Sequence, residues 1–160
     1  MAGTWKMFNN AKLILGQAGL ALPGTYRMAL FTSACNLKTS ASARPRVSKG
    51  ELTNEVANNF GYVTSGQSLG GEVWNTSISA RTLMWRYSLN PATGTGKWSA
   101  SGGTISAIKY AAIFFSGTTG ARKLLCYVTL TTGTGGISLA DTNTLAVKPA
   151  ATGIFNLSGM

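Results

Sequence analysis

The alternation of apolar and polar positions predicts a chain built mainly of strands. Apolar residues occupy every second position in residues 83–87 and again in residues 124–130, which is the period of a strand with one buried face. In residues 105–115 apolar side chains fall on both faces, as in a central strand or one that a partner covers. Runs bounded by turn-forming residues predict strands over the following ranges: 26–31, 72–79, 81–89, 105–115, 123–131, 144–148 and 153–157. The pattern predicts a mainly β protein, a sandwich or small barrel that forms a single domain over residues 1–160.

One or two short helices are expected near the N-terminus. Asn9 or Asn10 is a suitable N-cap for a helix that continues to about residue 16. Residues 48–55 favour a helical turn, because Ser48 is a preferred N-cap residue and Glu51 follows at the capping-box position. Residues 35–50, which lead into this turn, are rich in Ser, Ala, Lys and Arg and predict an extended, exposed loop or arm.

The charges are few and mostly positive. Charged residues make up 11% of the chain, against about 25% in an average soluble domain. Fourteen Lys and Arg residues against four acidic ones give a net charge of +10, which predicts an acidic partner. Nucleic-acid-binding chains usually concentrate their cations, whereas here only Arg44, Arg46 and Lys49 come close together. We therefore expect an acidic protein surface as partner rather than nucleic acid.

The residue types argue against an enzyme. The chain has no His, which removes the usual catalytic triads and most metal sites. Glu51 and Glu55 would share a helix face, as paired carboxylates might in glycoside hydrolysis, but acids near a helix start are ordinarily solvated complements of the helix dipole. Glycine-rich runs at 94–97 and 133–136 lack phosphate-loop spacing and predict turns. We expect no catalytic residues, no cofactor and no metal.

Two further features bear on the cellular setting. Cys35 and Cys126 lie far apart without a CxxC motif, so two buried thiols are the favoured interpretation, and a disulfide between them stays open. Residues 1–6 lack the layout of a signal peptide, and the apolar run at 11–22 is too short to span a bilayer. We expect synthesis in a cytoplasm and no association with a membrane.

Candidate contact residues fall into two groups. Trp74 and Trp98 stand near Gly- and Asn-rich turns, where they would either present an aromatic platform to a ligand or fill the core. Partner contacts are predicted in the N-terminal segment and in the arm, at the following residues: Trp5, Lys38, Arg44, Arg46 and Lys49.

A series of short segments follows in order along the chain: Phe8-Asn9-Asn10-Ala11-Lys12, then residues 26–31, Glu55-Val56, Gly61-Tyr62, Lys97-Trp98-Ser99 and residues 105–113. This layout resembles that of small tailed-bacteriophage virion proteins encoded among head and neck genes. The resemblance implies a β-sandwich or jelly-roll-like subunit, present in many copies, that decorates or cements the capsid or forms part of the neck or tail. It implies no catalytic residues.

Three hypotheses result. The first is a non-enzymatic virion protein, assembled in the host cytoplasm, that binds copies of itself and acidic capsid, neck or tail proteins. The second is a carbohydrate-binding receptor module of a tail or fibre, which requires Trp74 or Trp98 to be exposed. The third is a nucleic-acid-binding β-domain, which would depend on Arg44, Arg46 and Lys49.

Overall fold

A computed structural model describes residues 3–12, 25–38, 46–70, 73–77, 82–87, 96–116, 122–149 and 154–158. Within these ranges the protein is mainly β and every strand pairing is antiparallel, which confirms the predicted fold class. The finer description as a β-sandwich or jelly roll stays a prediction. The strands that the pattern predicted are β2 (Thr25–Thr32), β4 (Val73–Ser77), β5 (Thr82–Arg86), β7 (Ile105–Ser116), β8 (Leu124–Thr129), β10 (Thr144–Ala146) and β11 (Phe155–Ser158). The pattern did not predict β1 (Lys6–Met7), β3 (Gln67–Ser68), β6 (Lys97–Ser99) and β9 (Ile137–Leu139).

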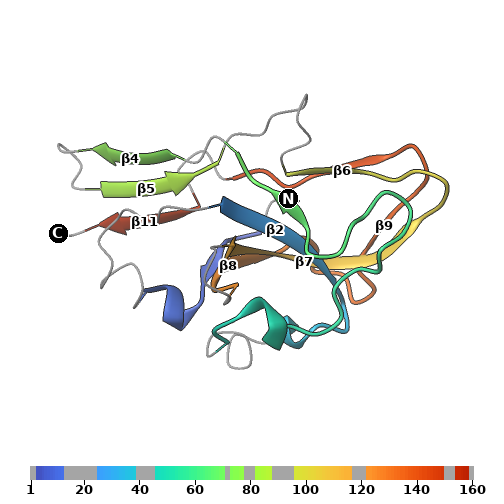
Figure 1. The fold of residues 1–160 in the computed structure, drawn as a ribbon, viewed down its shortest axis with the longest axis horizontal. Coiled ribbons are helices and arrows are strands. Elements are labelled where there is room, and N and C mark those ends of the chain that lie inside the picture. The colour runs from blue at the N-terminus through green and yellow to red at the C-terminus, as the bar shows by residue number, and fades with distance from the viewer. Residues whose placement is uncertain are drawn as a thin grey trace.

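The largest sheet has the strand order β1-β8-β7-β2-β3, with β9 paired to another part of β7 (Figure 1). β7 lies between β8 and β2, and residues 110–114 are all buried, so both of its faces are covered. The apolar residues on both faces of this strand are therefore those of a central strand, as predicted.

Two smaller sheets complete the fold. One has the order β11-β5-β4, on the left in Figure 1, and the other pairs β10 with β6. The rings of Tyr26 on β2 and Trp85 on β5 have centroids 5.0 Å apart, which packs the three-stranded sheet against the large one. The Tyr87 hydroxyl donates to the carbonyl of Val147, just after β10. The buried apolar residues of the described chain accordingly form one continuous core.

The helical elements are shorter than the sequence predicted. Residues 9–12 are helical, and the remainder of the predicted helix lies outside the described residues. The predicted turn at 48–55 is a single 3-10 turn, η2 (Lys49–Glu51). Ser48 is the N-cap residue of this turn, and Glu51 occupies the predicted capping-box position, because the Ser48 amide donates to Oε1 of Glu51 at 2.9 Å. That hydrogen bond is the main reason why the pKa of Glu51 is lowered.

The prediction of an exposed arm over residues 35–50 is wrong at both ends. Leu37, in the 3-10 turn η1 (Asn36–Lys38), is 2% exposed, and the Asn36 side-chain amide donates to the carbonyl of Glu51 at 2.8 Å. At the other end Ser48 forms an isolated β-bridge with Lys123. Both ends are therefore packed against the β body, and residues 39–45 lie outside the described residues.

The interpretation of the two cysteines as buried thiols is confirmed. Cys35 and Cys126 are free and fully buried. Burial raises the pKa of both thiols, which suppresses the reactive thiolate.

We expect neither thiol to react with Ellman's reagent in the native protein and both to react after denaturation in guanidinium chloride. Reaction of either thiol within minutes under native conditions would contradict the packing described for it.

Candidate docking surface

The two tryptophans proposed as ligand-facing differ in outcome. Trp98 is 1% exposed, because β6 pairs with β10 and directs this side chain into the core. Its predicted role as a ligand-facing residue is therefore wrong. Trp74 lies on β4 opposite Trp85 on β5, but its side chain is outside the part of the structure that is described.

The predicted basic contacts do not form one described patch. Lys49 pairs with Glu55, and each side chain is only 14% exposed, so the prediction of Lys49 as a free contact is wrong. Arg46 is half-buried and lies near enough to Glu51 to lower the pKa of that carboxyl. Lys38 is exposed at the end of η1, as a contact residue should be. Arg44 lies outside the described residues.

Glu55 is the centre of a polar network that fixes residues 46–70 to the large sheet. Its Oε1 accepts hydrogen bonds from the Tyr62 hydroxyl at 2.8 Å and from the Ser65 amide at 2.6 Å, while Oε2 pairs with Lys49. The Tyr62 hydroxyl in turn accepts from the buried amide of Leu30 on β2 at 3.0 Å. Burial, reinforced by the Glu55 carboxylate, raises the pKa of Tyr62, so its hydroxyl remains a donor. This carboxylate has a structural role.

The other described acids also accept hydrogen bonds from backbone amides. Glu51 accepts from the amides of Val47 and Ser48, and Asp141 accepts from the amides of Gly102 and Thr142. Among the described residues, the only ion pair is that of Lys49 with Glu55. The cations that remain exposed are the following: Lys6, Lys12, Lys38, Arg86, Arg122, Lys123 and Lys148. The described surface is therefore strongly basic, with its carboxylates already engaged.

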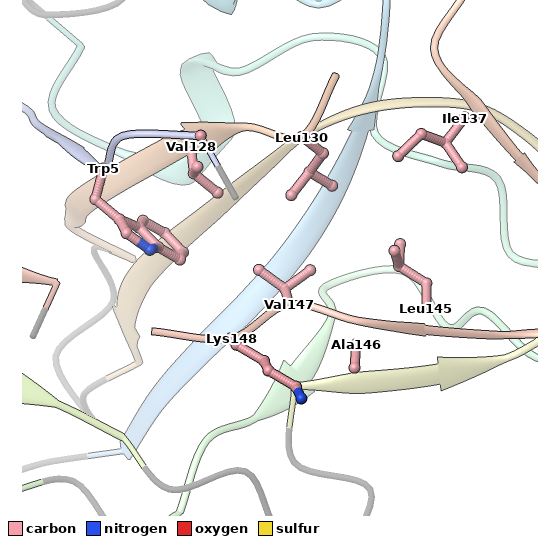
Figure 2. Close-up of a pocket in the computed structure, with 9 residues that line it drawn as sticks. Trp5, Val128, Leu130, Ile137, Leu145, Ala146, Val147 and Lys148 are labelled. Carbon is pink, nitrogen blue, oxygen red and sulfur yellow. The ribbon is translucent and has the colours of Figure 1, made fainter. Parts of the chain in front are cut away.

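An apolar groove opens between the large sheet and the end of β10. Val128 and Leu130 form one wall, and residues 145–148 form the opposite wall, as Figure 2 shows. Trp5 and Ile137 stand toward its two ends. The groove has a volume of about 300 Å³, and Lys148 is its one charged lining residue among those described. We call this feature the Trp5 groove.

A second hollow lies on the other face of the N-terminal segment. It is lined by Thr4, Lys6 and the threonines at 129, 131 and 132, and its volume is about 540 Å³. The hydroxyls and the Lys6 ammonium are hydrogen-bond donors, and no carboxylate lines this hollow in the described chain. We call it the threonine hollow.

Strand β1 holds the preceding residue, Trp5, in the lining of the Trp5 groove. Lys6 and Met7 pair with Tyr127 and Cys126 of β8, which holds the segment against the sheet. A Cβ atom at Gly3 would lie 2.0 Å from the carbonyl oxygen of Thr129, so this close approach requires glycine. Of the contacts predicted from sequence that the structure describes, Trp5 therefore lines a hollow. Sequence reasoning missed Leu145 and Lys148, because they reach the groove only through the tertiary fold.

A loop at residues 57–66 forms a separate apolar projection that sequence reasoning also missed. Val63 is 61% and Phe60 39% exposed, and the loop carries no charged residue. Phe60 has a φ of 48°, a conformation that persists only where the surroundings impose it. Here the Phe60 carbonyl accepts from the Ser101 amide at 3.1 Å, and Tyr62 anchors the loop to β2. The exposed apolar side chains are thus held on a well-fixed loop, a second candidate contact.

Within the described ranges, no three side chains able to ligate a metal come together. The helical segments described there are too short or too polar to cross a membrane. Comparisons of the chain with protein-family models, with curated proteins and with solved structures find no match.

Proposed function

We propose that the protein is a non-enzymatic structural protein of a tailed-bacteriophage virion. It attaches in multiple copies to an acidic surface of capsid, neck or tail proteins, as a decoration or cement subunit or as part of the neck or tail. The observation that carries the proposal is the arrangement of charge. Each described carboxylate already accepts hydrogen bonds from the protein's own chain, whereas Lys148 is exposed beside an apolar groove and Lys6 is exposed beside the threonine hollow.

This arrangement suits attachment to a fixed acidic lattice. Long-range attraction between opposite charges accelerates encounter and orients the subunit, and apolar contacts then hold it in place. The Trp5 groove supplies apolar area next to Lys148, and the loop at 57–66 supplies Phe60 and Val63. The resemblance in segment order to small head and neck proteins directs the proposal toward virions rather than toward other acidic assemblies.

The two alternative functions have lost part of their basis. A carbohydrate-binding module required Trp74 or Trp98 at the surface, and Trp98 is buried. A nucleic-acid-binding domain was to depend on Arg44, Arg46 and Lys49, and Lys49 is engaged by Glu55. Neither alternative is favoured by a specific observation.

The proposal is tested by cosedimentation of the purified protein with virus particles assembled without it. We expect the protein to sediment with the particles at roughly 50 mM salt and to be released progressively toward roughly 500 mM, because salt screens attraction between exposed charges. Duplex DNA and host-cell polysaccharide serve as parallel ligands. Absence of particle binding at low salt, or equal retention on DNA, would contradict the proposal.

A further inference from the structure

The outer edge of β1 carries backbone groups that face away from the large sheet and pair with no described strand. β1 is the terminal strand of that sheet, with β8 on its only paired side among the described strands. The Phe8 amide donates to the carbonyl of Leu125, which points it toward β8. Because amides alternate in direction along an antiparallel strand, that of Lys6 also faces β8, and those of Trp5 and Met7 face outward. The outward groups can pair with another extended chain.

The side chains of this segment alternate in character. Trp5 and Met7 are half-buried against the core on one face, whereas Thr4 and Lys6 are exposed on the other. Residues directly opposite each other on paired strands interact most favourably as apolar pairs or as opposite charges. A strand added to β1 would therefore place apolar side chains beside Trp5 and Met7 and acidic side chains beside Lys6.

Space and charge at the edge agree with such an occupant. The Trp5 groove lies on the apolar face of the segment and the threonine hollow on its polar face, so the neighbourhood is open on both sides. Lys6 and Lys148 line these features, and no carboxylate lines either of them among the described residues. A basic or uncharged strand would leave Lys6, on the polar face, without a counter-charge.

We infer that β1 is a docking edge that receives an extended segment of the partner protein, in which apolar and acidic residues alternate. Backbone hydrogen bonds to Trp5 and Met7 supply affinity, and the alternation supplies specificity. This inference rests on the proposed function, since it names the part of the acidic partner that the candidate docking surface receives.

The inference is tested with capped eight-residue peptides and fluorescence anisotropy at low salt. One labelled peptide alternates Val with Glu, and its control alternates Val with Lys. We expect the protein to bind the Val/Glu peptide at least about tenfold more tightly, because each opposite-charge pair adds to binding while each like-charge pair opposes it. Equal affinity for the two peptides, or no binding of the Val/Glu peptide, would overturn the inference.

A proline variant tests the role of the backbone edge. Met7→Pro removes an outward amide without removing one that faces β8, and edge strands tolerate proline at such positions. Met7→Ala is the matched control, because both variants lose the methionine side chain. We expect Met7→Pro to bind the Val/Glu peptide at least about tenfold more weakly than Met7→Ala, with similar urea unfolding midpoints. Equal peptide binding by the two variants would overturn the inference.

Particle binding separates failure of the inference from failure of the proposed function. If Met7→Pro attaches to particles as well as Met7→Ala does, the edge is not the docking element and the proposed function stands. If the wild-type protein binds the Val/Glu peptide in a manner sensitive to Met7→Pro but never binds particles, the docking edge stands and the proposed function is wrong.

Discussion

A Glu55→Ala variant is expected to lose about 3 kcal/mol of unfolding free energy, because the substitution leaves a mostly buried ammonium without its counter-charge. Lys49 is only 14% exposed in the ion pair. The same change removes the acceptor for the Tyr62 hydroxyl and for the Ser65 amide. Folded domains of this size are stable by about 5–15 kcal/mol, so the loss would be a large part of the total. Urea denaturation followed by tryptophan fluorescence measures it.

Two further variants show whether the loss of charge or the loss of hydrogen bonds lowers the unfolding free energy of Glu55→Ala. Glu55→Gln keeps a side-chain oxygen that can accept from Tyr62 and Ser65 but lacks the charge that Lys49 requires, so we expect an intermediate loss. Glu51→Ala removes an acceptor near the surface, with a cost of about 1 kcal/mol, as for the loss of a helix cap. Similar destabilisation by Glu55→Ala and Glu51→Ala would contradict the central position assigned to Glu55.

The sequence predicted the long strands because their burial is encoded locally. In β7 apolar residues on both faces predicted a central strand, and residues 110–114 are all buried. In β8 the alternation predicted one buried face, which is wrong, because Leu125 and Tyr127 on the other face are buried as well. Both strands form the middle of the large sheet. The missed strands β1, β3, β6 and β9 are two or three residues long. A pattern of period two has no room to develop over such a length, and these strands exist because longer neighbours offer backbone groups for pairing.

The incorrect site predictions have a common physical origin. Trp98 follows a turn-rich run, which favours exposure, yet pairing of β6 with β10 covers it. Lys49 belongs to a local run of cations, but its partner Glu55 lies six residues further along, beyond the 3-10 turn. Leu37 is one apolar residue in a polar run, and the body of the protein buries it. In each case tertiary contacts decide, and composition over a short window does not contain them.

The Trp5 groove was beyond sequence reasoning for the same reason. Its walls come from β8 and from the chain around β10, and Trp5 reaches it only because β1 pairs with β8 (Figure 2). The sequence did single out Trp5, as a large aromatic residue in a short N-terminal segment. It contained no signal that Lys148 would stand beside the same groove, about 140 residues further along the chain.

Reversing the charge of Lys148 at the groove and of Lys6 at the hollow is expected to weaken particle attachment by about 100-fold, or about 2.8 kcal/mol. In the double variant Lys6→Glu with Lys148→Glu, two attractive charge interactions with an acidic lattice become repulsive. Both side chains are exposed and in no ion pair among those described, so the fold should not be affected. Cosedimentation with particles at low salt measures the change, and circular dichroism checks the fold.

A matched variant distinguishes a defined docking surface from diffuse attraction. Lys38→Glu with Lys123→Glu reverses the charge of two exposed side chains near the ends of the predicted arm. Each Lys→Glu change removes two units of charge, so both double variants carry +6 instead of +10. If attraction depends on net charge alone, the two variants weaken binding equally, and the Trp5 groove and the threonine hollow have no special role. If Lys38 and Lys123 face the partner instead, the second variant is the weaker binder. We expect the Lys6 and Lys148 variant to be at least about tenfold weaker, because short-range repulsion acts only where the surfaces meet.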